Sequence, residues 1–215
     1  MFKRRRGLLV MLAGLGAFGM MSMDFYLPAF PQVAADLGVP VGSVQLTMST
    51  CLIGLAVGQV LWGPTSDRYG RRAPLIAGLT LFIATSLLIA FIHSFPVLVA
   101  LRLLQGFGGS SGIVIGRAIL RDLFSGTDLA RAMSMIVSIV AITPVLAPIV
   151  GAGVLLIAPW PTIFVVQAVF GTACLVGVLR FTDTLAPDRR ATHGFVGALR
   201  QYGALATNPR FLYGA

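Results

Sequence analysis

The stretch GPTSDRYGRR, residues 63–72, separates two long apolar blocks of the chain. Four of its ten residues carry a charge, and its glycines, Gly63 and Gly70, suit positions where the backbone turns or packs closely. The apolar blocks on either side each approach the roughly 20 residues that a membrane-spanning helix requires. The stretch therefore predicts a tight turn between two antiparallel helices that cross a membrane.

The composition extends this prediction to the whole chain. Of the 215 residues, 57% are hydrophobic and only 11% are charged. A soluble domain of this length needs more charged residues to cover its surface. We therefore predict an all-α, polytopic membrane protein with six transmembrane helices. The expected helices cover residues 7–30, 43–66, 73–92, 95–122, 129–157 and 161–181.

The basic residues predict how the chain is oriented. The sequence holds 16 Lys and Arg against 7 Asp and Glu. The Lys and Arg residues outside the expected helices occur in alternate connections. The connections at 31–42, 92–96 and 157–161 contain no Lys or Arg. Because Lys and Arg mark cytoplasmic connections, we expect the N-terminus and residues 182–215 in the cytoplasm. Because the basic residues orient the chain in the membrane, the positive charge does not indicate a nucleic-acid partner. The Arg-rich composition suggests that the membrane is a bacterial inner membrane.

The N-terminal segment begins with basic residues and continues as an apolar run, as a signal peptide does. No small-x-small cleavage site follows this run at the usual distance, and five more apolar blocks come after it. We therefore predict an uncleaved first helix, with a cleaved signal peptide as the alternative.

Asp24 lies in the otherwise apolar run GMMSMDFYLPAF, residues 19–30. Arg102 in the fourth expected helix lies at a similar depth. A charge at the centre of a membrane helix costs about 2.5–3.5 kcal/mol, so we expect both to face one water-filled cavity, where Asp24 can load and release a proton. Pro28 cannot bond the carbonyl of Asp24 and predicts a bend. The alternative is that Asp24 is solvated near the membrane surface.

Residues 63–72 resemble the cytoplasmic loop signature of the major facilitator superfamily. The resemblance implies a charge cluster that latches the cytoplasmic side, and it implies that Asp122 joins Arg68 or Arg71 there. The alternative is a basic anchor with turn glycines. The matching positions are Gly63, Asp67, Arg68, Gly70, Arg71 and Arg72.

The segment LVALRLLQGFGGSSG, residues 98–112, looks like the R-x-x-Q-G motif of the same superfamily, with Arg102 and Gln105 in place. The resemblance implies that this pair lines a central cavity. Gly108, Gly112 and Gly116 recur every four residues, which predicts a stripe of close helix contact.

The segment ITPVLAPIVGAG, residues 142–153, stands where drug/proton antiporters of the superfamily carry Gly-Pro-x-x-Gly-Gly. Here Ala147 and Ala152 replace two of the glycines. MDFYLPA in the first helix together with this APxxG is similar to the Bcr/CflA subfamily of drug-resistance transporters. The prolines free two carbonyls and predict a bend in a gating helix. The residues of this gating-helix motif are Pro144, Pro148 and Gly151.

The resemblance implies a twelve-helix fold of two six-helix halves, each with inverted three-helix repeats. Residues 1–181 would form the N-terminal half, and residues 182–215 the linker and the start of a seventh helix. The implied function is proton-coupled antiport that exports amphipathic or cationic drugs by alternating access, with no cofactor besides the proton gradient. The expected partners are a small-molecule substrate, protons, the lipid bilayer, and a C-terminal half or a second copy. The proton- and substrate-binding candidates are Asp24, Tyr26, Arg102 and Gln105.

Two other interpretations stay open at this point. The superfamily motifs also fit a transporter for a single metabolite. Alternatively, the chain is a truncated half or a membrane scaffold that does not transport. An enzyme is not expected, because the sequence contains no nucleophile–base set, metal-ligand cluster or phosphate-binding loop.

Overall fold

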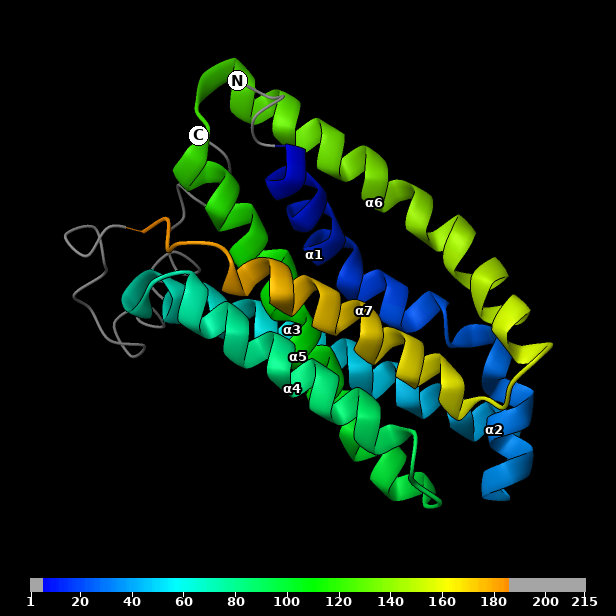
Figure 1. The fold of residues 1–215 in the computed structure, drawn as a ribbon. Coiled ribbons are helices and arrows are strands. Elements are labelled where there is room, and N and C mark those ends of the chain that lie inside the picture. Colours follow the sequence, from blue (N-terminus) through cyan, green and yellow to red (C-terminus); the bar gives the residue numbers. More distant parts are fainter. Residues whose placement is uncertain (1–5, 186–215) are drawn as a thin grey trace, which may run out of the picture.

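The computed structural model describes residues 6–185. Within this range every regular element is a helix (Figure 1). The elements are α1 (Arg6–Asp24), the short 3-10 turn η2 (Leu27–Ala29), α2 (Phe30–Leu37), α3 (Val41–Tyr69), α4 (Arg72–Ile89), α5 (Phe95–Leu123), α6 (Gly126–Leu155) and α7 (Pro161–Leu179).

The long helices are membrane spans by length and composition. Five of them, α3 to α7, are long and apolar enough to cross a membrane, and the bent pair Leu9–Gly19 and Met21–Leu37 makes a sixth if it is counted as one span. The prediction of an all-α, multi-pass membrane protein is therefore confirmed. The predicted start of a seventh helix lies outside the described residues.

The spans bring most of the arginines to one end of the bundle, which we call the basic end. It holds the α3–α4 turn, the α5–α6 turn and the C-terminal end of α7 (Figure 1). The opposite end holds α2 and the connections at 90–94 and 156–160, and these segments contain no Lys or Arg. The arginines at the basic end include Arg68, Arg71, Arg72, Arg121, Arg131 and Arg180.

The first span differs from the single helix predicted over residues 7–30. α1 ends at Asp24, and the span is bent by 50° between Leu9–Gly19 and Met21–Leu37. Pro28 has no N–H with which to bond the carbonyl of Asp24. The chain makes tighter turns here instead, and the Tyr26 N–H donates to the Met23 carbonyl at 3.1 Å. The helix is therefore interrupted directly after Asp24, while the 50° bend itself lies between Gly19 and Met21.

The turn between α3 and α4 is shorter than the sequence indicated. α3 continues to Tyr69, so Asp67 and Arg68 lie in its last turn rather than in a loop. Gly70 then reverses the chain with a φ of +88°, in the left-handed region that favours glycine. Only Gly70 and Arg71 connect the two helices, so these charges are held on rigid backbone.

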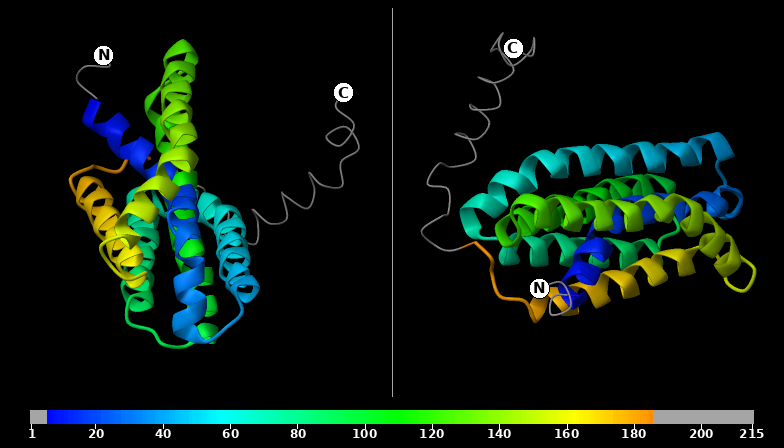
Figure 2. Two further views of the ribbon diagram at one scale, coloured as in Figure 1. Left: turned by 90° about the vertical axis from the view of Figure 1, so that its right-hand side faces the viewer. Right: turned by 90° about the horizontal axis from the view of Figure 1, so that it is seen from above.

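α5 is the centre of the bundle and packs against α1, α3 and α4 (Figure 2). A Cβ on Gly106 would overlap a backbone carbonyl of α3. A Cβ on Gly108 would lie 2.7 Å from a carbonyl of α4, and one on Gly112 would lie 2.8 Å from a carbonyl of α1. The predicted glycine stripe therefore lets α5 pack closely against two neighbouring helices, α4 and α1. With the contact at Gly106, α5 has little room to move against α1, α3 or α4.

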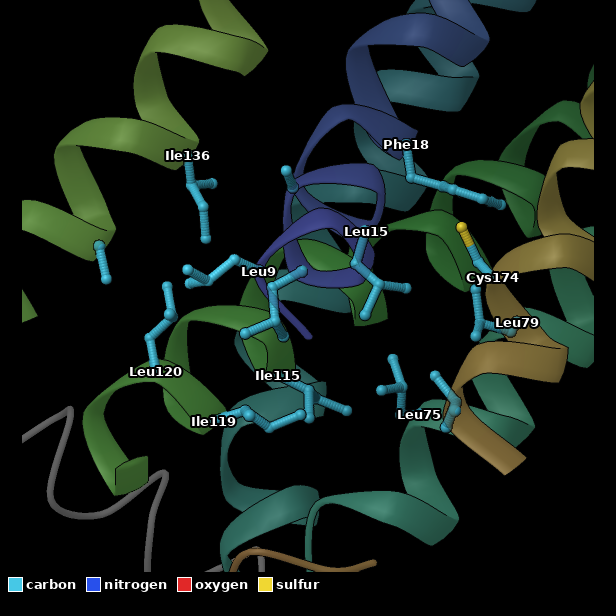
Figure 3. Close-up of a cluster of buried hydrophobic side chains, with 14 of the residues drawn as sticks. Leu9, Leu15, Phe18, Leu75, Leu79, Ile115, Ile119, Leu120, Ile136 and Cys174 are labelled. Carbon is cyan, nitrogen blue, oxygen red and sulfur yellow. The ribbon is translucent and has the colours of Figure 1, made fainter. Parts of the chain in front are cut away.

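Apolar side chains form two buried clusters. Figure 3 shows the cluster toward the basic end, where side chains from α1, α4, α5, α6 and α7 meet. It includes Leu15, Phe18, Leu79, Ile115, Ile136 and Cys174. The cluster toward the opposite end includes Tyr26, Val33, Leu98, Trp160 and Phe164. Buried polar residues of α1, α4, α5 and α7 lie between the two clusters along each helix.

α6 is the least buried span. It packs chiefly against α1 and lies at one edge of the bundle (Figures 1 and 2). Val137, Val145 and Ile149 are 63%, 64% and 64% exposed, and α3 also exposes a row of large apolar side chains. Apolar faces of this extent need lipid or another helical surface to cover them.

The close approach of α5 to α3 yields a stability prediction. Gly106→Ala places a methyl group against the α3 backbone, and overpacking of this kind costs about 1–3 kcal/mol. We expect the melting temperature in detergent to fall and the yield of folded protein to drop. Gly153→Ala is the matched control, because a Cβ there meets nothing within 4 Å. Equal melting temperatures for the two variants would contradict the α3–α5 packing.

Candidate functional site

Arg102 on α5 is fully buried in the middle of the bundle. Its Nη1 donates to Oε1 of Gln105 at 2.6 Å and to the carbonyl and Oγ of Ser22 on α1, both at 3.3 Å. Its guanidinium carbon lies 4.8 Å from the ring centroid of Tyr26 and 5.7 Å from that of Phe164. Aromatic faces attract a cation at such distances, so two rings and three oxygens hold this charge.

Gln105 connects Arg102 to two further helices. Its Nε2 donates to Oγ of Ser86 on α4 at 2.7 Å and to Oε1 of Gln167 on α7 at 3.0 Å. Gln167 in turn donates from Nε2 to the Ser22 carbonyl at 3.3 Å. These five residues form one buried polar layer that joins α1, α4, α5 and α7.

The charge of Arg102 has no ionic counterpart within residues 6–185. The ion pairs in this range both involve Arg71. Nε and Nη2 of Arg102 are buried and have no hydrogen-bond partner. Since a buried donor without a partner carries its full desolvation penalty, two positions on this guanidinium are open to an acceptor.

Asp24 lies two residues after Ser22, at the C-terminal end of α1. It is half-buried, and the described residues offer its carboxyl group no hydrogen bond or ion pair. The structure does not join Asp24 to Arg102, which contacts Ser22 instead. The predicted pairing of the two charges in one cavity therefore stays a prediction.

A second group of charges lies at the basic end. Arg71 donates from Nη1 to Oδ1 of Asp67 and to Oγ of Ser66, from Nε to Oδ2 of Asp122 at 2.9 Å, and from Nη2 to Oδ1 of Asp122 at 3.4 Å. Of the two arginines expected to meet Asp122, the structure selects Arg71. Arg68 is exposed, with its guanidinium 5.3 Å from the centroid of the Tyr69 ring.

The surroundings of Arg71 keep it charged. Burial by itself disfavours the ionised form, but the hydrogen bonds and charges of Asp122 and Asp67 outweigh burial and raise the pKa of the guanidinium above its usual value. Arg71 therefore bridges α3 and α5 as a fixed cation at every working pH, and only a movement of the helices can separate it from its two carboxylates.

The segment after α7 also contacts this group, which the sequence did not indicate. Oδ1 of Asp183 accepts a hydrogen bond from the Arg71 backbone N–H at 2.9 Å, and Thr184 donates to Oδ2 of Asp122 at 3.1 Å. Arg72 donates from Nη2 to the Leu179 carbonyl at the end of α7 at 2.7 Å. The signal available in the sequence was an acidic residue directly after the last span.

The gating-helix motif lies on a continuous helix. Pro144 and Pro148 are both inside α6, which runs unbroken from Gly126 to Leu155. A Cβ on Gly151 would overlap the Phe25 carbonyl. Glycine at this position therefore lets α6 approach the break that follows Asp24.

Polar residues that the sequence analysis passed over complete the buried layer. Ser22, Ser86 and Gln167 lie in helices composed mostly of apolar residues, and polar residues inside membrane spans are costly unless they find partners. That rule singled out Arg102 and Gln105, and it could also have found these three.

Comparison with known proteins agrees with the motifs. A model of the Major Facilitator Superfamily matches residues 10–215. The chain belongs to the major facilitator superfamily. The family consists of transporters, so the expectation that the chain is not an enzyme is confirmed.

Relatives of this superfamily chain include drug-resistance proteins. It is 38% identical over 213 residues to the MFS-type transporter YdgK of Bacillus subtilis, covering 98% of the chain and 53% of the relative. It is 37% identical to the bicyclomycin resistance protein homolog of Haemophilus influenzae, covering 77% and 40%, and 38% identical to multidrug resistance protein D of Escherichia coli, covering 69% and 38%. The resemblance to the Bcr/CflA subfamily is confirmed, and the chain spans about half the length of these relatives or less.

Solved structures confirm the superfamily fold. The human organic anion transporter MFSD10 superposes with a TM-score of 0.72 at 20% identity, over 94% of this chain and 56% of that protein. A D-xylose–proton symporter superposes with a TM-score of 0.74 at 15% identity, over 100% of this chain and 55% of the symporter. At these identities the likeness concerns the fold alone, and it fits half of a superfamily transporter.

The polar layer of this superfamily protein yields a second prediction. Gln105→Leu removes the shortest hydrogen bond of Arg102 and leaves Ser86 and Gln167 without their Gln105 partner. Because each unsatisfied buried polar group costs about 1–3 kcal/mol, we expect a clear fall in melting temperature. Gln59→Leu on the exposed face of α3 is the control and should change little. A Gln105→Leu protein as stable as the control would show that the layer does not support the fold.

Proposed function

We propose that residues 1–181 are the N-terminal half of a proton-coupled antiporter, and that it exports amphipathic or cationic drugs by alternating access. The observation that carries the proposal is Asp24, a carboxyl group in a membrane span without a partner in the described structure. The drug-resistance relatives support export as the direction and drugs as the substrate class.

Asp24 is suited to exchange a proton for a cationic substrate. A carboxylate in a membrane span needs neutralisation, and a proton or a substrate cation supplies it. The two exclude each other at one carboxyl group, which couples inward proton flow to outward movement of substrate. Tyr26, two residues further on, places its ring beside Arg102, which supports a binding site next to the break in the first span.

Arg102 would act as the fixed charge of this exchange. Its free Nε–H and Nη2–H groups can donate to the ionised Asp24 carboxylate after a movement of the break, and they lose this anionic partner once Asp24 is protonated. Differential contacts of this kind are what a ligand needs to shift a conformational equilibrium. Gln105 keeps the guanidinium in place in both states.

The Arg71 group would form the latch of the cytoplasmic gate. The distribution of arginines supports a cytoplasmic basic end and cytoplasmic residues 182–215, and the bacterial relatives support a bacterial inner membrane. Gly63, Gly70, Arg68 and Arg72 belong to the same motif around the α3–α4 turn. Pro144, Pro148 and Gly151 would let α6 move against the break after Asp24.

The exposed apolar faces of α3 and α6 support a further six-helix half as the missing partner of this bundle. A second copy of the chain is the other candidate for this position, where it would close the central cavity. Both arrangements would bury the apolar rows that the single half exposes.

The role of Asp24 is tested by dye efflux. Cells that lack their main pumps would express the 215-residue chain alone, or the chain joined to the second half of the Bacillus subtilis relative. We expect energised efflux of an amphipathic cationic dye, and we expect Asp24→Asn to reduce it to the level of cells without the protein, because asparagine cannot exchange a proton.

Asp128→Asn, in the first turn of α6, is the matched control and should transport normally. Efflux by the chain alone would indicate self-association, whereas efflux by the fusion alone would indicate a required second half. Undiminished efflux by an Asp24→Asn protein would contradict the coupling role. If both expressed and inserted wild-type forms fail to transport the dye, drug export by this protein is wrong.

The latch is tested by a double-mutant cycle on Arg71 and Asp122. Each variant removes the charge-assisted hydrogen bonds between Asp122 and the buried Arg71. Hydrogen bonds to charged groups are worth about 1.5–3 kcal/mol each, so Arg71→Gln and Asp122→Asn should each lower efflux and stability. The double variant should be no worse than Arg71→Gln alone, because the two residues act as one unit. Arg131→Gln, exposed near the start of α6, is the control. Additive losses in the double variant would contradict a shared role.

A further inference from the structure

A cavity of about 340 Å³ lies between α1, α5 and α6, in the half of the bundle toward the basic end. In Figure 3, Ile136 of α6 and Leu120 of α5, which both line it, point toward one another beside α1. Of its thirteen lining residues, twelve are apolar, glycine or proline, and the other is Arg117. The cavity therefore combines one cation with a wall that is otherwise apolar.

Arg117 is the exposed cation of this cavity. Within the described range it makes no hydrogen bond or ion pair, unlike Arg71 and Arg102, which the protein's own side chains hold. No acidic residue lines the cavity. Arg117 lies six residues before the end of α5, which is roughly 9 Å along the helix at 1.5 Å per residue. The charge is thus below the end of the helix and free to bind an anion.

We propose that this cavity binds an amphipathic anion. The apolar body of the ligand lies between α5 and α6, and its carboxylate, sulfonate or phosphate group accepts hydrogen bonds from the Arg117 guanidinium. Ligand pockets of about 300–1,000 Å³ are typically apolar with a few placed polar groups, and this cavity falls within that range. Binding of the anion does not depend on the proposed function. Only the further step, that amphipathic anions are among the exported substrates, rests on it.

The walls of the cavity fit a flat apolar body. Gly16 on α1 and Gly116 on α5 both line it and contribute no side chain. A Cβ on Gly116 would meet no neighbour closer than 3.9 Å, so the cavity extends up to the α5 backbone at this position. Val137 lies on the α6 side of the cavity and is 63% exposed, which gives an approach from outside the bundle.

The test compares two fluorescent probes that differ in one charge. Wild-type chain in nanodiscs of phosphatidylcholine would be titrated with anthracene-9-carboxylate and with its neutral methyl ester, and binding to empty nanodiscs would be subtracted. We expect Arg117→Gln to weaken binding of the acid relative to the ester by roughly tenfold, the size expected for one hydrogen bond to a charged group.

Three variants separate a binding site from a membrane anchor. Arg117→Lys keeps the charge and should retain most of the preference for the acid. Arg121→Gln, four residues along α5 and outside the cavity lining, should leave the preference unchanged. Val137→Trp reduces the apolar space and should weaken binding of both probes alike. Equal acid-to-ester ratios in wild type and Arg117→Gln would overturn the proposal, as would an equal loss in Arg121→Gln.

The anion can come from a substrate or from a lipid headgroup, and added phosphatidylglycerol distinguishes the two. If it displaces the acid from wild type but not from Arg117→Gln, the bound amphipathic anion is a lipid; if it does not displace the acid, the site is open to soluble anions. Because binding is read without transport, the proposal survives a failure of the dye-efflux test. Conversely, normal dye efflux with no acid preference would overturn this site and leave the proposed function intact.

Discussion

The structure depends on the placement of one buried charge, that of Arg102. A guanidinium in the centre of a membrane protein is tolerated only with acceptors, and here Gln105, the Ser22 backbone and two aromatic rings provide them. Because these partners come from different helices, holding the charge also fixes how α1, α4, α5 and α7 meet. The two apolar clusters pack on either side of this polar layer.

The polar layer also places the break in the first span. Ser22 is held by Arg102 and Gln167, and the helix ends two residues later at Asp24, since Pro28 cannot continue the hydrogen-bond ladder. A change in the charge of Asp24 would therefore act on a backbone segment already joined to Arg102. The proposed coupling between the two would require no long pathway.

The sequence predicted most of the fold, because apolar blocks of membrane length and alternating arginines are signals of composition and spacing. It also predicted which residues carry charge in the membrane. It could not predict that Arg102 would contact Ser22 rather than Asp24, or which of Arg68 and Arg71 would meet Asp122, because those choices depend on helix rotation. The contact of Asp183 with the α3–α4 turn was missed for a similar reason: it joins residues 112 positions apart, and no local pattern encodes it.

Two of the three arginines of α5, Arg102 and Arg117, divide the bundle into a fixed part and an adjustable part. Arg102 is enclosed by helices that approach α5 at backbone distance through glycines, so that side of the bundle resists movement. Arg117 instead faces the cavity beside α6, which packs chiefly on α1 and approaches the break through Gly151. The volume around Arg117 and the surroundings of Asp24 therefore depend on the same loosely held helix. A movement of α6 would alter both sites together, and α5 would serve as the fixed axis against which it moves.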